Sequence, residues 1–124
     1  IEVKVPDIGD YSDVPVIEAA RLPLLSSFSR SALLAAKQAA PNLPRAYLLE
    51  NLHESWRSEA QELAVVAIHL NHRGLQQDQV KMLKDAGYGV FCYTVNQLER
   101  ARELLRWGVD GFCTDRLDLI PYDF

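Results

Sequence analysis

The chain has 124 residues, 48% of them hydrophobic, which suffices for one modest domain with a buried core and argues against global disorder. Its formal net charge of -4 argues against a general nucleic-acid binder, which would need a basic face. No apolar stretch is long enough to span a bilayer and no signal peptide opens the chain, so we expect a cytoplasmic protein. Cys92 and Cys113 are too few for a disulfide scaffold, and we expect both to be reduced and buried.

Short strand-like runs recur roughly every twenty residues, and helical stretches separate most of them. The six runs are Glu2–Val5, Leu24–Ser27, Ala46–Leu49, Ala64–His69, Gly89–Val95 and Gly111–Thr114. This alternation predicts parallel strands joined by right-handed crossovers, and in such sheets chemistry collects where the strands end. The polar residues at those ends are Glu2, Lys4, Ser26, Ser27, Glu50, His69, Thr94, Asn96, Thr114 and Asp115.

Capping residues and apolar spacing predict the helices between these runs. They cover Val14–Arg21, Ser31–Ala40, Ser55–Leu63, Gln77–Ala86 and a last stretch from Asn96 to Gly108. Ser29 is a good N-cap, and Asn96 with Glu99 three residues later reads as a capping box. Leu105 is expected to face the core, and the charged run Glu99–Glu103 to form a solvated helix face.

The start of the chain departs from this regular pattern. The first connection is barely long enough for a parallel crossover, so we hypothesise that residues are missing between Pro6 and Leu22. The chain also begins at Ile1, directly ahead of a strand, which indicates a fragment or a processed chain.

A doubly wound open sheet and a barrel both fit the alternation of strands and helices. No strand is followed by a Gly-rich phosphate-binding fingerprint, which favours an α/β fold of the TIM-type (β/α)8 barrel class. Six of the eight strands are present. We therefore predict a single domain over residues 1–124 that is the C-terminal portion of a barrel, with the first two strands ahead of Ile1.

Several pieces of the chain, in order, resemble the C-terminal part of the glycerophosphodiester phosphodiesterase family, most of all its cytosolic bacterial members. The pieces are Ile1–Lys4, Pro23–Phe28, Leu43–Leu49, Ile68–Asn71, Tyr93–Asn96, Leu105–Gly111 and Cys113–Asp115. The resemblance implies a divalent-metal hydrolase that cleaves a small-molecule glycerophosphodiester to sn-glycerol 3-phosphate and an alcohol.

In the family's Glu-x-Lys strand, which matches Glu2 and Lys4, the glutamate is a metal ligand and the lysine lies beside the phosphate. The resemblance therefore implies Glu2 as a metal ligand for Mg²⁺ or Ca²⁺ and Lys4 as a catalytic residue. The physical chemistry agrees, since these hard cations prefer carboxylate oxygen, and a metal and an ammonium together stabilise charge on phosphate. The alternative reading is an edge strand with solvated charges.

The family's other key residues match nothing in this chain: a His-Arg-Gly strand end, a Glu-x-Asp metal pair and a second histidine. His72-Arg73-Gly74 spells the triplet but follows a different strand, and we interpret it as a coincidence. We therefore expect the isolated chain to turn over little or no substrate. The alternative is a non-catalytic truncated barrel that serves as a scaffold or small-anion-binding module.

Five further residues are weaker candidates for substrate binding: His69, Ser27, Phe28, Tyr93 and Asn96. Each has a plainer reading, namely a hydrogen-bonded strand-end histidine, a pocket wall, ordinary barrel packing or, for Asn96, a helix cap. A truncated barrel would also leave strand edges and apolar helix faces uncovered, so we expect the segment alone to self-associate or to be only partly ordered.

Overall fold

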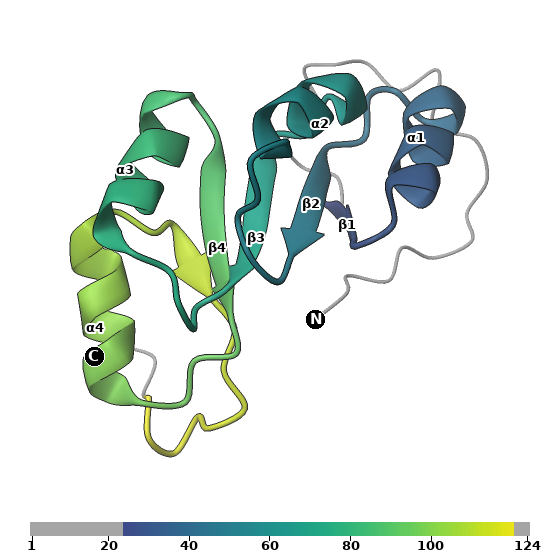
Figure 1. Cartoon of the computed structure of the whole chain (residues 1–124). Helices are drawn as coiled ribbons and strands as arrows, with labels where there is room; N and C mark the ends of the chain where they lie inside the picture. The colour runs from purple at the N-terminus through teal and green to yellow at the C-terminus, as the bar shows by residue number, and fades with distance from the viewer. Residues whose placement is uncertain (1–23, 121–124) are drawn as a thin grey trace. The chain divides into compact units, whose positions relative to one another are not determined.

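The computed structural model describes residues 24–120, which fall into two compact units. The first unit comprises residues 24–48 and 53–66, and the second comprises residues 49–52 and 67–120. In each unit strands alternate with helices (Figure 1), which confirms the predicted α/β class. Glu2, Lys4, the predicted elements Glu2–Val5 and Val14–Arg21, and the hypothesis about Pro6–Leu22 lie outside the described residues.

The first unit contains two parallel strands and two helices. They are β1 (Leu25–Ser27), α1 (Arg30–Ala39), β2 (Arg45–Leu49, whose last residue falls in the second unit) and α2 (Trp56–Leu63). In the register of β1 and β2, Leu25 lies opposite Arg45. The predicted N-cap of α1 is confirmed, because the hydroxyl of Ser29 accepts a hydrogen bond from the backbone N–H of Ala32 at 3.2 Å.

The second unit contains three parallel strands and two helices (Figure 1). They are β3 (Ala67–Asn71), α3 (Gln77–Asp85), β4 (Gly89–Tyr93), α4 (Leu98–Trp107) and β5 (Gly111–Phe112). β4 pairs with β3 on one side and with β5 on the other. Each connection runs through a helix, as parallel strands require.

Side chains of β3 and β4 alternate between two environments, as the period of two in a strand dictates. One set is fully buried together with apolar residues of the helices: Ile68, Leu70, Val90, Cys92, Val80, Leu83, Ala101 and Leu104. Apart from the buried Ala67, the other set, which includes His69 and its register partner Phe91, is only half-buried. Gly111 faces Phe91 so closely that an added Cβ would lie 2.9 Å from the ring, so the last strand accepts no side chain there.

The start of β3 was wrongly predicted. Ala64 ends α2 in the left-handed conformation with φ of 52°, and its N–H bonds back to the helix. Val66 is 52% exposed and precedes the strand, so the predicted run from Ala64 is not a strand over its first residues. The strand begins only at Ala67 because the first residues of the run are used to terminate the helix.

The start of α4 also differs from the prediction. Its N-cap is Gln97 rather than Asn96, and Leu104 is buried while Leu105 is 41% exposed. Asn96 does not cap the helix because its amide oxygen accepts hydrogen bonds from Thr114 and Asp115. The predicted end is confirmed, since Gly108 adopts a φ of 103° that favours glycine.

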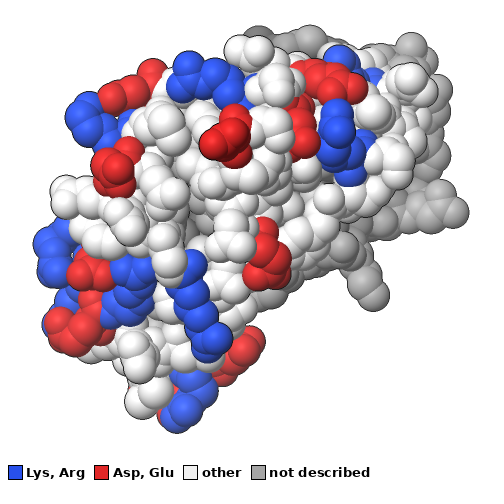
Figure 2. All heavy atoms as spheres, viewed as in Figure 1, with Lys and Arg blue, Asp and Glu red and all other residues white. Residues whose placement is uncertain are grey.

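Within the described residues, no helix is both long and apolar enough to cross a bilayer. On the face drawn in Figure 2, basic and acidic side chains of these residues are interspersed rather than gathered by sign. Cys92 and Cys113 are free, as predicted. Cys92 is buried, which raises the pKa of its thiol to about 12, whereas Cys113 is only half-buried.

Candidate functional site at the strand ends

The carboxyl ends of β3, β4 and β5 in the second unit surround a polar pocket of about 230 Å³. Its lining consists of residues that end a strand or follow it: Asn71, His72, Arg73, Tyr93, Thr94, Asn96 and Asp115. Parallel strands bring their carboxyl ends to the same edge of a sheet, which is why residues far apart in the sequence meet here. The predicted candidates Tyr93 and Asn96 are both in this lining.

Two asparagine side chains fix the backbone around the pocket. The amide oxygen of Asn71 accepts a hydrogen bond from the backbone N–H of Arg73 at 3.0 Å. The amide oxygen of Asn96 accepts hydrogen bonds from the Thr114 hydroxyl at 3.0 Å and from the backbone N–H of Asp115 at 2.9 Å. Both loops are therefore held by side-chain amides at the strand ends.

Tyr93 lies at the end of β4, and a hydrogen bond from its hydroxyl restrains its side chain. The hydroxyl donates a hydrogen bond to the backbone carbonyl of Leu49 at 2.8 Å. Burial, and next the negative charge of Glu50, raise the pKa of Tyr93 to about 12, so the phenol stays protonated at neutral pH. Glu50 itself accepts a hydrogen bond from the amide of Asn71 at 3.2 Å.

His72 is held as a neutral hydrogen-bond acceptor. Arg100 donates from Nε to Nδ1 of His72 at 3.2 Å, and its guanidinium also donates to the backbone carbonyl of His72. Burial first, and then the charges of Arg100 and Arg73, lower the pKa of His72. This arrangement gives His72 a structural role, and the interpretation of His72-Arg73-Gly74 as a coincidence remains a prediction.

Arg100 corrects the prediction that its stretch of α4 is a solvated helix face. Only 19% of its side chain is exposed, and it pairs with Glu103. Its guanidinium lies 5.0 Å from the centre of the Trp107 ring, a cation–π distance. The reason is tertiary, because the loop after β3 presents carbonyl groups that the arginine binds.

His69 is the third of five residues in β3, so its predicted place at a strand end is wrong. Its Nε2 is buried and has no hydrogen-bond partner among the described residues. Burial lowers its pKa to about 4, and its ring centre lies 5.1 Å from that of Phe91. His69 is therefore neutral at physiological pH, and it is not in the pocket lining.

Ser27 and Phe28 lie at the carboxyl end of β1 in the first unit. The hydroxyl of Ser27 accepts a hydrogen bond from the backbone N–H of Ser29 at 3.0 Å, which shapes the turn into α1. Phe28 is 47% exposed. The neighbouring Ser26 hydroxyl is buried without a hydrogen-bond partner among the described residues. A substrate role for Ser27 or Phe28 stays a prediction.

Sequence reasoning missed Arg73 as a site residue and counted Asp115 only among the polar residues at strand ends. Both now line the pocket. Asp115 directly follows the predicted strand Gly111–Thr114, and this position was the signal that placed it among the strand-end residues, whereas Arg73 lies beyond the predicted strand end at His69. Arg73 was obscured by the triplet that it shares with His72 and Gly74.

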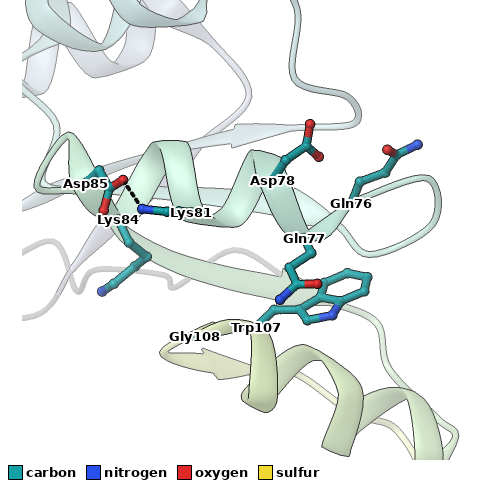
Figure 3. A pocket seen from close by; sticks show the side chains of 8 residues that line it. All are labelled: Gln76, Gln77, Asp78, Lys81, Lys84, Asp85, Trp107 and Gly108. Atoms are coloured by element: carbon teal, nitrogen blue, oxygen red, sulfur yellow. Dashed lines mark hydrogen bonds and ion pairs between the residues drawn. The ribbon is translucent and has the colours of Figure 1, made fainter.

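The described residues do not form a metal centre, since no group of three or more His, Cys, Asp or Glu side chains in residues 24–120 could hold an ion. A larger hollow of about 680 Å³ lies between α3 and α4, with Trp107 and Gln77 at one end and the Lys81–Asp85 ion pair at the other (Figure 3). It shares no residue with the strand-end pocket.

Parallel strands alternating with helices, with a polar pocket at the strand ends, define an α/β protein of the class that places its site at the carboxyl ends of the strands. The chain belongs to the glycerophosphoryl diester phosphodiesterase family, whose model matches residues 9–119. It is similar to the glycerophosphodiester phosphodiesterase of Bacillus subtilis strain 168, with 33% identity over 100 residues, 77% of this chain and 34% of the relative.

Solved structures agree with this assignment. A phosphodiesterase from Oleispira antarctica, in complex with the product sn-glycerol-3-phosphate, matches with a TM-score of 0.72 and 30% identity over 74% of this chain and 37% of that chain. A glycerophosphodiester phosphodiesterase from Parabacteroides distasonis matches with a TM-score of 0.62 and 25% identity over 75% of this chain and 39% of that one. The predicted partial TIM-type barrel is confirmed, and the chain spans about a third of the length of these relatives.

Proposed function

We propose that the protein carrying this chain hydrolyses glycerophosphodiesters to sn-glycerol 3-phosphate and an alcohol. The observation that carries the proposal is family membership over residues 9–119, combined with a polar pocket at the strand ends of the second unit. The product bound to the Oleispira antarctica relative has the chemistry expected here, a phosphate and polar hydroxyl groups.

The catalytic part of the proposal rests on Glu2 and Lys4, matched to the family's Glu-x-Lys strand. The family is in general dependent on a divalent cation. We propose Mg²⁺ or Ca²⁺ with Glu2 as one ligand, since carboxylate oxygen suits these ions. Bound there, the cation would neutralise phosphate charge. Lys4 would hold the phosphate by its ammonium group and stabilise negative charge that grows during attack on phosphorus.

Two described residues have groups suited to substrate binding in the pocket. The amide oxygen of Asn96 is already occupied, so its NH₂ group is the part that can donate to a substrate oxygen. The hydroxyl of Tyr93 is bonded to Leu49, so the residue would offer its ring to a glycerol carbon face. Substrate contacts by His69, Ser27 and Phe28 remain weaker proposals. A cytoplasmic location and self-association of the segment also stay predictions.

The test is hydrolysis of sn-glycero-3-phosphocholine by the protein expressed from its full natural reading frame, with released sn-glycerol 3-phosphate measured by a coupled dehydrogenase. We expect turnover with Mg²⁺ or Ca²⁺ that is lost when a chelator removes the ion. Lys4→Ala should lower kcat by about 10²–10³-fold, the usual cost of losing one group that stabilises transition-state charge. Glu99→Gln, an exposed carboxylate on α4 outside the pocket, is the control and should keep wild-type activity.

The same assay separates the enzyme from a non-catalytic scaffold. A well-folded full-length protein that binds sn-glycerol 3-phosphate without hydrolysing any glycerophosphodiester would support the scaffold or anion-binding module. Unchanged activity in Lys4→Ala would contradict the proposed role of that lysine.

A further inference from the structure

The strand-end pocket holds two opposite charges that are not paired with each other. Arg73 and Asp115 both line it, and no ion pair within residues 24–120 involves either of them. Most other described charges near the helices are paired, for example Lys84 with Asp110 at 2.7 Å. A cation and an anion left open to one pocket can accept a ligand that carries both signs.

The rest of the lining is neutral at physiological pH. The pKa of His72 is lowered by burial and by the two arginines, and the pKa of Tyr93 is raised to about 12. Asn71, Thr94 and Asn96 carry no charge. Among the described residues that line the pocket, Arg73 and Asp115 are therefore the two that carry a charge, one of each sign.

Both charged residues sit on backbone that is fixed by hydrogen bonds. The N–H of Arg73 is held by Asn71, and the N–H of Asp115 is held by Asn96. Arg100 further restrains the loop that carries Arg73 by bonding to the carbonyl groups of His72 and Leu75. Arg100 is thus a positioning residue, and hydrogen bonds hold the backbone at both charged positions.

We propose that Arg73 and Asp115 form a subsite for a zwitterionic phosphodiester whose alcohol carries a primary ammonium group, such as glycerophosphoethanolamine; this inference rests on the proposed function. The planar guanidinium of Arg73 takes the phosphodiester anion. The carboxylate of Asp115 takes the ammonium, which donates hydrogen bonds. A pocket of about 230 Å³ is smaller than the roughly 300–1,000 Å³ typical of drug-sized ligands and suits a small headgroup.

The test compares two substrates that share the glycerophosphate half: glycerophosphoethanolamine and glycerophosphoglycerol, whose second alcohol is neutral. For the full-length protein we expect a higher kcat/KM for the ethanolamine diester. Asp115→Asn should lower the ratio of the two kcat/KM values by about three- to tenfold, as expected for one partly exposed charged contact. Arg73→Gln should raise KM for both diesters by a similar factor and leave the ratio unchanged. The control Glu99→Gln should alter neither.

Calorimetric titration of the uncleaved ethanolamine diester into the protein, with chelator present to prevent hydrolysis, gives a second readout. Weaker binding in Asp115→Asn, together with loss of the preference over the glycerol diester, supports the subsite. An equal effect of Asp115→Asn on both diesters would overturn it while leaving the proposed hydrolysis intact. So would a preference for glycerophosphocholine that Asp115→Asn does not change, because a quaternary ammonium has no N–H to donate. Absence of hydrolysis for every diester would instead contradict the proposed function. The ratio of the affinities for the ethanolamine and glycerol diesters would then still show whether the subsite exists.

Discussion

Each unit has an arginine that is largely withdrawn from solvent, and the two arginines serve opposite ends of the strands. In the first unit Arg45, at the start of β2, is 5% exposed and donates to the carbonyl groups of Leu43, Leu63 and Ala64 at 3.1–3.2 Å. In the second unit Arg100, on α4, donates to carbonyl groups of the loop that follows β3. One arginine binds the end of a helix at the amino end of a strand, and the other binds a loop at the carboxyl end.

The difference shows that an arginine at the amino end of a strand serves stability, whereas one near the carboxyl ends supports the site. In barrels of parallel strands the amino ends of the strands carry structure, while the carboxyl ends carry the site. Arg45 donates hydrogen bonds to carbonyl groups that have no partner within α2 at its carboxyl end. This structural role needs no ligand. Arg100 instead holds the loop after β3 through the carbonyl group of His72, and the residue that follows His72, Arg73, lines the pocket.

The largest expected effect is the loss of stability on replacing Arg45. Arg45→Ala should lower the free energy of unfolding by about 3 kcal/mol or more, because it leaves several carbonyl groups without their charged donor in a buried place. Urea unfolding of the full-length protein checks this. Arg102→Ala on the exposed face of α4 is the control and should cost under about 0.5 kcal/mol. A loss for Arg45→Ala no larger than that of the control would break the comparison.

A smaller effect on stability is expected for Arg100→Ala, about 2 kcal/mol, because the side chain is partly exposed and its loop can be rescued by water. This variant should also raise KM, since the loop that holds Arg73 would lose its anchor, whereas Arg45→Ala should leave the KM of the folded fraction unchanged. Steady-state kinetics at a temperature where both variants are folded distinguish them. Equal changes in KM would mean that the two arginines have the same, purely structural role.

The effect that is smallest near neutral pH concerns His69 and sharpens the account of the second unit's interior. Burial lowers the pKa of His69 to about 4, while in the unfolded chain it is near 6.5. Between these values the unfolded state binds the proton and the folded state does not, so His69 makes stability fall as pH drops from about 6.5 to 4. His69→Gln should flatten that part of the curve of unfolding free energy against pH. A curve with the same slope in wild type and variant would show that His69 is not held neutral.

Most of the fold could be predicted from local signals. The spacing of apolar runs located β1, β2, β4 and β5, and Ser29 and Gly108 marked helix ends correctly. The prediction of β3 began too early because Ala64 takes a left-handed conformation that glycine or asparagine would normally signal. Such a cap in an alanine has no sequence signature.

The site could be predicted only in part. Tyr93 and Asn96 were identified because they lie near the end of a clear strand, and both line the pocket. Asn96 instead accepts hydrogen bonds from Thr114 and Asp115, which follow the later strand β5, so tertiary contacts overrode its preference for capping a helix. Arg100 looked like a surface charge, since only the folded loop after β3 supplies the carbonyl groups that bury it.

The central proposal is that the protein carrying this chain is a phosphodiesterase in which Lys4 holds the phosphate group. A crystal structure of the full-length protein with sn-glycerol 3-phosphate bound tests it most directly. The account predicts phosphate oxygens within hydrogen-bond distance of the Lys4 ammonium, with Tyr93 and Asn96 lining the same cavity. A product molecule bound in the groove between α3 and α4, or a Lys4 side chain that faces away from the strand ends, would contradict it.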